Sequence, residues 1–231
     1  MKKKPGKEKH WLERELDDYD SEVGEIDSAA RDNVTNFRAS LAHHCPRTLW
    51  YYRKGYKEEP PTSQGRRRMN IGTLYHDFID AKFRGKGLLV SAEEDVIFDD
   101  PPILGHYDAV VKHPGTGEDH LIELKSYAQP KPNSRFRLKL PKIEHIGQWN
   151  LYAAYLKIKQ GNIFYINKND QSYKIYDQIF KPKLVEGIFK KLRMVQRALD
   201  NDERIPYQPN ENHDWCPFKT QCERDWFIRG E

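Results

Sequence analysis

Cysteine is scarce in this chain of 231 residues, which contains three of them. An odd and small number argues against a disulfide framework. Long apolar runs are also missing, because no stretch approaches the roughly 20 apolar residues that cross a bilayer. The sequence begins Met-Lys-Lys-Lys-Pro-Gly-Lys, and no apolar segment follows to make this a secretory signal. We therefore expect a cytoplasmic protein that does not associate with membranes.

The composition is polar, but it contains enough apolar residues for one domain of ordinary size. Hydrophobic residues make up 37% and charged residues 32% of the chain, with thirteen tyrosines and five tryptophans. The formal net charge is +4, but residues 1–35 contain ten acids and seven Lys/Arg, so the other 196 residues carry +7. A basic body suits a polyanionic partner such as nucleic acid, although many soluble proteins reach this charge.

The N-terminal segment differs in composition from the rest of the chain. A lysine cluster is followed by eight acids between Glu13 and Asp27, with little apolar periodicity. This pattern predicts a charged, flexible tail over residues 1–32 and a single domain over residues 33–231. Binding of a partner, or masking of the domain's own basic surface, is an alternative role for the tail.

Apolar periodicity predicts strands that alternate with helices in the domain. Helical spacing is found over residues 69–83, 143–159 and 183–199. Short β-rich runs predict strands over residues 88–91, 95–98, 103–112, 120–126, 162–167 and 172–180. Gly117 and the two acids after it predict a hairpin between the third and fourth of these strands. Residues 58–68, with two prolines and the triplet Arg66-Arg67-Arg68, predict an exposed basic loop.

Three charged residues on two predicted strands suggest metal-assisted phosphodiester cleavage. Asp108 ends the run Gly105-His-Tyr-Asp, and Glu123 and Lys125 alternate in the run His120 to Ser126. Side chains two residues apart on a strand point to the same face, so Glu123 and Lys125 would share one cleft. Asp108, Glu123 and the carbonyl of Leu124 could hold Mg²⁺ or Mn²⁺, and Lys125 could position the attacking water. An isolated Glu-x-Lys pair, however, is usually an ordinary exposed strand.

Two further motifs flank these acids and identify a family. Gly72-Thr-Leu-Tyr-His76 lies upstream, and His145-Ile-Gly-Gln148-Trp-Asn-Leu-Tyr152 lies downstream. In this order, the motifs resemble the RecB-like branch of the PD-(D/E)XK nuclease superfamily, including CRISPR-associated RecB-like exonucleases and phage-encoded relatives. The resemblance covers residues 36–231. The residue before Asp108 is Tyr107 rather than the proline of the motif name, a position at which the family varies freely.

The resemblance implies an α/β fold with a restriction-endonuclease-like core, a central mixed β-sheet flanked by helices. It implies a divalent-metal-dependent deoxyribonuclease, most simply an exonuclease on single strands or DNA ends. Such enzymes serve recombination, repair or phage DNA metabolism, and a phage-encoded one would work in the host cytoplasm. No helicase motif is present, so a motor would be a separate partner protein. The alternative is a catalytically silent nucleic-acid-binding module on the same fold.

The resemblance also assigns roles to residues outside the three charged ones. His76 corresponds to a family metal ligand, and one imidazole beside carboxylates favours Mn²⁺ somewhat. Gln148 and Tyr152 are four apart on one helix face, and by resemblance they support the site and contact DNA near the scissile phosphate. Glu93 or Glu94 could supply a further acid.

A basic segment follows the predicted catalytic strand. Between Lys125 and Ile143 the chain has six Lys/Arg and no acid, with Tyr127 and Phe136 as aromatic neighbours. This composition fits a groove that grips single-stranded nucleic acid through its phosphates and bases. The expected contacts are Arg135, Arg137, Lys139, Lys142, Gln148 and Tyr152. A merely solvated loop is the alternative.

The cysteines form a second pattern with a C-terminal histidine. The end of the chain contains His213, Cys216 and Cys222 at the spacing His-x2-Cys-x5-Cys, and Cys45 lies far upstream. Several RecB-like nucleases hold a four-iron–four-sulfur cluster with one upstream cysteine and a C-terminal Cys-x2-Cys-x5-Cys, which this pattern resembles with His213 at the first position. Three thiolates and an imidazole also suit Zn²⁺, so zinc is the alternative to the cluster. Either metal would staple a C-terminal helical segment to the N-terminal helix, and three ordinary reduced cysteines are a further alternative.

A different hydrolase could use His43, His44 or His106 as metal ligands. Adjacent histidines on a helix point in divergent directions, so this arrangement is the weaker hypothesis.

Overall fold

The structure is a computed structural model that describes residues 10–30, 35–58, 60–129, 139–206 and 216–227. The helices are α1 (Trp11–Ala30), the 3₁₀ turn η1 (Ala39–Leu41), α2 (Pro46–Arg53), α3 (Ser63–Gly85), α4 (Ile143–Leu156), α5 (Pro182–Asp200) and α6 (Lys219–Phe227). The strands are β1 (Phe37–Arg38), β2 (Leu89–Ala92), β3 (Asp95–Phe98), β4 (Ile103–His106), β5 (Ala109–Lys112), β6 (Asp119–Tyr127), β7 (Gln160–Asn167) and β8 (Tyr173–Ile179).

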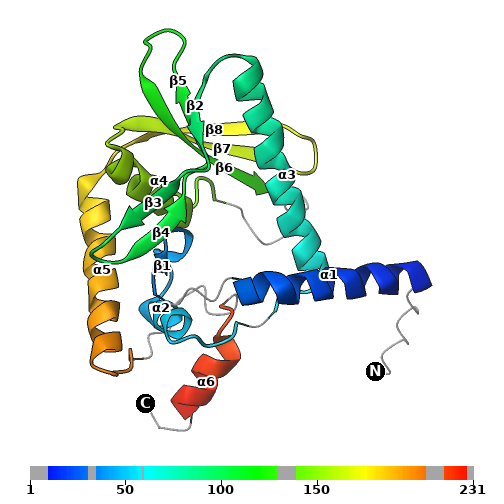
Figure 1. The fold of residues 1–231 in the computed structure, drawn as a ribbon, viewed down its shortest axis with the longest axis vertical. Helices are drawn as coiled ribbons and strands as arrows, with labels where there is room; N and C mark the ends of the chain where they lie inside the picture. Colours follow the sequence, from blue (N-terminus) through cyan, green and yellow to red (C-terminus); the bar gives the residue numbers. More distant parts are fainter. Residues whose placement is uncertain (1–9, 31–34, 59, 130–138, 207–215, 228–231) are drawn as a thin grey trace.

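The strands form two sheets, which helices cover on both sides (Figure 1). The larger sheet has the order β2-β5-β6-β7-β8, and the smaller has the order β1-β4-β3. Strands β6 and β7 are parallel and are connected through α4, whereas the other neighbours in the larger sheet are antiparallel. Helix α4 packs on one face of this sheet and α3 packs on the other, while α5 packs against α4 and α2. The predicted α/β fold with a mixed sheet flanked by helices is confirmed.

Alternation along β6 divides the core into two parts. Ile122 and Leu124 face α3 and pack with Ile79 of that helix. Leu121 and Tyr127 point the other way, into the larger cluster beneath α4 and α5. Because strand side chains alternate between faces, Glu123 and Lys125 share the face of Leu121 and Tyr127, beneath α4.

The predicted strand 103–112 is wrong, because the chain leaves one sheet and enters the other within it. Residues 103–106 form β4 of the smaller sheet, and residues 109–112 form β5 of the larger sheet. Tyr107 stands at the break, where its buried hydroxyl donates to Glu94 Oε2 at 2.7 Å and lies 2.6 Å from Ser91 Oγ. Asp108 occupies the following position, outside either strand. The predicted hairpin is confirmed, since β5 and β6 pair antiparallel around Gly117, whose φ is +73°.

The basic triplet Arg66-Arg67-Arg68 lies in the first turns of α3, so the predicted loop over these residues is wrong. The side chain of Thr62 caps this helix by accepting a hydrogen bond from the Gly65 N–H at 3.1 Å. A threonine cap stabilises a helix start by about 1 kcal/mol, and Pro61 ends the preceding extended segment. The helix therefore begins before the apolar periodicity that predicted it.

Much of the segment expected to be a flexible tail forms helix α1, which crosses the N-terminal end of α3 (Figure 1). Asp17 and Asp20 pair with Arg67 of α3 at 2.6 and 2.8 Å. The apolar side chains Leu12 and Leu16 are 47% and 55% exposed, so in its described N-terminal part α1 contacts α3 through charge rather than through these leucines. The remainder of the predicted tail, residues 1–9 and 31–32, lies outside the described residues.

The C-terminal helix packs directly on the N-terminal part of the domain. The Tyr51 hydroxyl in α2 donates to Asp225 Oδ2 in α6 at 2.8 Å. The ring of Phe218 lies against Tyr51 and Tyr52, with centroids 5.3 and 4.7 Å apart. Across the part of the chain that the structure describes, no helix combines the length and apolarity needed to cross a bilayer.

Candidate active site

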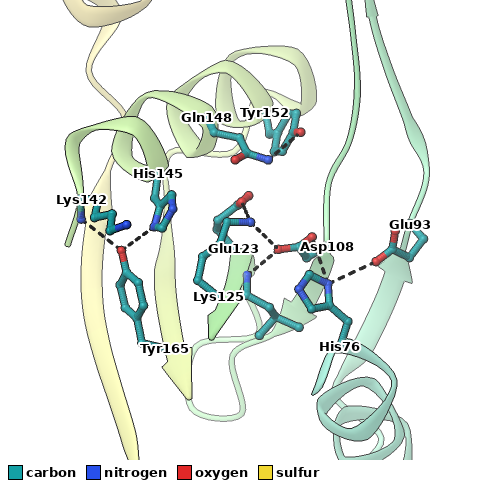
Figure 2. Close-up of polar contacts among 11 residues, drawn as sticks. His76, Glu93, Asp108, Glu123, Lys125, Lys142, His145, Gln148, Tyr152 and Tyr165 are labelled. Atoms are coloured by element: carbon teal, nitrogen blue, oxygen red, sulfur yellow. Dashed lines mark hydrogen bonds and ion pairs between the residues drawn. The ribbon is translucent and has the colours of Figure 1, made fainter. Parts of the chain in front are cut away.

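Three charged side chains meet where β5 begins beside β6 (Figure 2). Lys125 Nζ contacts Glu123 Oε1 and lies 3.8 Å from Asp108 Oδ2. The backbone N–H of Leu124 donates to Asp108 Oδ2 at 2.5 Å, which orients this carboxylate toward β6. The structure thus brings together the acid–acid–lysine group that the sequence singled out, with the ammonium between the two carboxylates.

Burial makes the charge on Glu123 depend on its neighbours. Its side chain is fully buried, and burial followed by the charge of Asp108 raises its pKa, while Lys125 opposes the shift. Burial would lower the pKa of Lys125, but the charges of Glu123 and Asp108 raise it overall, so the ammonium stays protonated. Glu123 Oε2 has no hydrogen-bond partner among the described residues. A buried carboxylate oxygen without a partner needs a further cation or donor.

A group of possible metal ligands adjoins these residues. Nδ1 of His76, on α3, lies 3.4 Å from Asp108 Oδ1 and 3.7 Å from Glu93 Oε1. One ligand atom from each of the three residues lies within 4.8 Å of the others. Burial would lower the pKa of His76, but Glu93 and Asp108 raise it overall, as expected where carboxylates gather without a cation. Two carboxylates and one imidazole suit Mn²⁺ or Mg²⁺.

Glu93 is the acid beside His76 that sequence reasoning could not separate from Glu94. It follows β2 with a φ of +54°, a left-handed conformation that is costly for glutamate, and its N–H donates to the Tyr107 carbonyl at 3.1 Å. This turn sends Glu93 toward His76, while Glu94 hydrogen-bonds Tyr107 instead. Only the pairing of β2 with β5 brings Glu93 beside Asp108, and neither the strand order nor the turn is visible in the sequence.

Gln148 and Tyr152 line the α4 side of the site and are buried, with exposures of 7% and 2%. Gln148 Nε2 donates to the Tyr152 hydroxyl at 3.0 Å, and burial and the charge of Glu123 raise the pKa of Tyr152. Gly105 makes room for this hydroxyl, because a Cβ there would lie 2.8 Å from Tyr152 Oη. Because Gln148 and Tyr152 are buried, a role in positioning Glu123 fits them better than direct contact with DNA.

Sequence reasoning gave no role to His145, which lies in the first turn of α4. Its Nδ1 is 2.7 Å from the hydroxyl of Tyr165, and that hydroxyl accepts a hydrogen bond from the Lys142 N–H at 3.1 Å. Burial, then the charges of Lys125 and Lys142, lower the pKa of His145 to about 3. In the sequence, the only indication that His145 belongs to the site is that the motif containing Gln148 begins at this residue.

The basic segment after β6 is described only in part. Arg135, Phe136 and Arg137 lie outside the described residues, whereas Lys139 and Lys142 are exposed immediately before α4. The expectation that Tyr127 stacks on bases is wrong. This ring is buried at the end of β6 with the Lys174 ammonium 5.3 Å from its centroid, because the strand alternation turns it into the core.

The cysteines lie together where α2 meets the C-terminal segment. Cys216 Sγ is 3.3 Å from Thr48 Oγ1 in α2. Burial raises the pKa of Cys222, Arg47 opposes this, and the nearby thiols of Cys45 and Cys216 add to it. The fourth predicted ligand, His213, lies outside the described residues. Among those that are described, the three sulfurs do not all fall within 4.8 Å of one another.

The histidines of the rival metal site do not gather into one group with other possible ligands among the described residues. His43 packs on Gly147 of α4, where a Cβ would lie 1.7 Å from its Nε2. His106 Nε2 pairs with Asp95 Oδ1 at 2.6 Å on the smaller sheet. Neither these two nor His44 joins a group of three possible metal ligands in the described ranges. The geometry therefore gives the rival hydrolase no support.

Comparisons with known proteins agree with the geometry. The sequence profile described as PD-(D/E)XK nuclease superfamily matches residues 90–223, more than half of the chain. The fold resembles the crystal structure of SSO0001, with a TM-score of 0.53, 18% identity, and coverage of 80% of this chain and 85% of that one. It also resembles LHK-Exo in complex with dAMP, with a TM-score of 0.51, 17% identity, and coverage of 77% and 93%.

A second structure of the latter protein, an alkaline exonuclease from Laribacter hongkongensis, gives a TM-score of 0.50 at 18% identity, with coverage of 77% and 93%. At these identities the likeness concerns the fold alone. No curated protein matches the sequence.

Proposed function

Because this chain belongs to the PD-(D/E)XK nuclease superfamily, we propose that it is a divalent-metal-dependent deoxyribonuclease of the RecB-like branch. It acts as an exonuclease on single strands or DNA ends, in recombination, repair or phage DNA metabolism. The observation that carries this proposal is the convergence of Asp108, Glu123 and Lys125 beside the His76–Glu93 pair. A catalytically silent binding module would not need a buried carboxylate with a partnerless oxygen.

The donor atoms fit Mg²⁺ or Mn²⁺. His76, Glu93 and Asp108 would hold the ion, with Glu123 and the carbonyl of Leu124 as further oxygen ligands. When bound, the ion supplies a more acidic water and neutralises charge that builds on the phosphate. The buried Glu123 oxygen without a partner supports this assignment, because a cation would supply the missing interaction.

The chain's own residues position the reactants. Lys125 keeps its proton between two acids, so it acts as a fixed positive charge that orients the attacking water and stabilises the phosphate. Gln148 and Tyr152, which are hydrogen-bonded to each other, form the side of the site that α4 contributes next to Glu123. Lys139 and Lys142, with Arg135 and Arg137, bind the phosphates of the strand that approaches along α4. The structure of the similar exonuclease with dAMP supports DNA as the substrate, and a recombination or helicase protein could act as partner.

The metal assignment can be tested on two adjacent acids. Glu93→Gln should weaken Mn²⁺ binding measured by calorimetry about tenfold or more, because it removes one of three close ligands. Glu94→Gln is the matched control, since its carboxylate bonds Tyr107 instead. Equal affinities for both variants would refute the assignment of Glu93.

We also propose that Cys45, Cys216 and Cys222, with His213, hold a four-iron–four-sulfur cluster, with Zn²⁺ as the alternative. The nearness of Cys222 to both other thiols supports a shared site. Protein purified without oxygen should be brown and should absorb at the blue end of the visible range. Colourless protein with stoichiometric zinc would reject the cluster, and protein with neither metal would reject the site.

A further inference from the structure

The hydrogen bonds around Tyr165 determine how the imidazole of His145 is held. Tyr165 lies on β7 directly opposite Lys125 in the parallel register, and its side chain is buried. Its hydroxyl accepts the Lys142 N–H at 3.1 Å, and its other partner among the described residues is His145 Nδ1 at 2.7 Å, to which we assign the phenolic proton. Nδ1 is then an acceptor, and a neutral imidazole with Nδ1 as acceptor carries its proton on Nε2.

The surroundings keep this imidazole neutral. Burial and the charges of Lys125 and Lys142 act in the same direction, and the pKa of His145 falls to about 3. Figure 2 shows the His145 ring on the same side of the site as Lys125, whose charge acts on it. His145 is therefore a neutral donor at any working pH, unlike the lysines on either side of it.

The position of His145 on α4 directs it toward the substrate path. His145, Gln148 and Tyr152 follow each other at i, i+3 and i+7, so they share one face of the helix. That face lies over Glu123 and Lys125 of β6 (Figure 2). Gln148 and Tyr152 are buried there, but His145 is only half-buried and stands at the end of α4 beside the exposed Lys142. It is the member of the series that a bound strand can reach.

We propose that His145 is a catalytic residue that donates a hydrogen bond from Nε2 to a non-bridging phosphate oxygen of the cleaved DNA strand, with Tyr165 as its positioning residue. This inference rests on the proposed nuclease function. The hydrogen bond from a neutral donor is directional, so it orients the phosphate beside Lys125. Because the donor carries no charge, it does not add to the release of counterions when DNA binds.

The test compares Mn²⁺-dependent cleavage of single-stranded DNA by the wild type, His145→Ala, His145→Gln, Tyr165→Phe and Lys142→Ala. His145→Ala should lower kcat about 10- to 100-fold, the usual effect of losing a hydrogen bond to a charged group. Its Mn²⁺ affinity and the salt dependence of its DNA binding should not change. His145→Gln, which keeps an N–H near the place of Nε2, should recover most of kcat, and Tyr165→Phe should fall between the two.

Lys142→Ala is the matched control on the same turn. It should reduce the slope of log K against log salt by about 0.7, because it removes one charge from a single-strand contact. Melting temperatures show which variants fold. If His145→Ala does not fold, the comparison of His145→Gln and Tyr165→Phe with the wild type still tests the proposal.

The inference fails if His145→Ala keeps kcat within twofold of the wild type, or if folded His145→Gln is as impaired as His145→Ala. It also fails if Mn²⁺ affinity is lost in parallel with kcat, which would indicate damage to the metal site. A wild-type protein that does not cleave DNA with Mn²⁺ overturns the proposed function itself, and that result is distinct because it precedes any comparison of variants.

Discussion

Lys125 supplies the positive charge between the two carboxylates of the site. Its ammonium lies between Glu123 and Asp108, and removal of one partner from a buried ion pair leaves an uncompensated charge. Substitution of one of these three charged residues should therefore lower the folding stability of the protein as well as its catalytic activity. The sequence showed which residues these are, because their spacing on a strand places Glu123 and Lys125 on one face.

Lys125→Met should destabilise the metal-free protein by about 3 kcal/mol at pH 8, because Glu123 is left buried without its positive neighbour. Added Mn²⁺ should restore most of this loss, since the ion supplies the missing charge. Urea denaturation in chelator and in Mn²⁺ measures both quantities. Lys174→Met, an exposed lysine on β8, is the control. Equal stability of the Lys125 variant in both conditions would contradict this account.

His145 should make the protein sensitive to acid. Its folded pKa of about 3 lies below the ordinary value of 6.5, so the unfolded state binds more protons between these pH values. Its contribution to stability is therefore complete above pH 6.5 and is lost as the pH falls toward 3. Relative to His145→Gln, the wild type should lose up to about 3 kcal/mol between pH 6.5 and 4. Urea midpoints of both proteins across this range test the difference, and parallel curves would show that the imidazole is not held neutral.

At the scale of elements, the prediction succeeded where apolar periodicity and burial coincide. Helices α4 and α5 and the β5–β6 hairpin each bury one face in the core, and the sequence located them to within a few residues. It failed where one stretch serves two sheets, because residues 103–112 were predicted as a single strand although β4 and β5 belong to different sheets. It also missed α1, whose described side-chain contacts with α3 include two carboxylates on Arg67, a contact that apolar periodicity cannot reveal.

Gly105 couples β4 to α4, and its substitution should disturb the site from a distance. A Cβ would come within 2.8 Å of both Ala39 Cβ and Tyr152 Oη, so Gly105→Ala should cost about 1–3 kcal/mol and reduce cleavage. Gly187→Ala is the matched control within α5, where a Cβ meets nothing within 4 Å, and it should stabilise by about 0.5–1 kcal/mol. Thermal unfolding and nuclease rates measure both. A Gly105→Ala protein as stable and active as the wild type would contradict the packing of Tyr152 described above.

Helix α1 should detach when its charged contact is removed. Arg67 holds Asp17 and Asp20, and exposed ion pairs of this kind weaken as salt increases. Arg67→Ala should speed proteolysis within residues 11–30 with little change in the thermal midpoint of the domain. Arg84→Ala, whose pair with Asp80 lies within α3, should leave the cleavage rate unchanged. Identical digestion of both variants would mean that other contacts hold α1.

At the scale of the whole molecule, the fold gathers the site from four separate parts of the chain. His76 comes from α3, Glu93 from the turn after β2, Asp108 from the crossing between sheets, and Glu123 with Lys125 from β6. The acids and the lysine could be found in the sequence because they share a local pattern. Glu93 and the His145–Tyr165 pair could not, because strand order and packing alone bring them to the site.

The most direct test of the central claim is a time course on DNA labelled at one end, single- and double-stranded, with Mn²⁺ and with chelator. The account predicts progressive shortening that requires the metal and that disappears in Asp108→Ala, Glu123→Ala and Lys125→Ala proteins that remain folded. Binding of DNA without cleavage by the wild type in Mn²⁺, or cleavage that survives in all three variants, would contradict it.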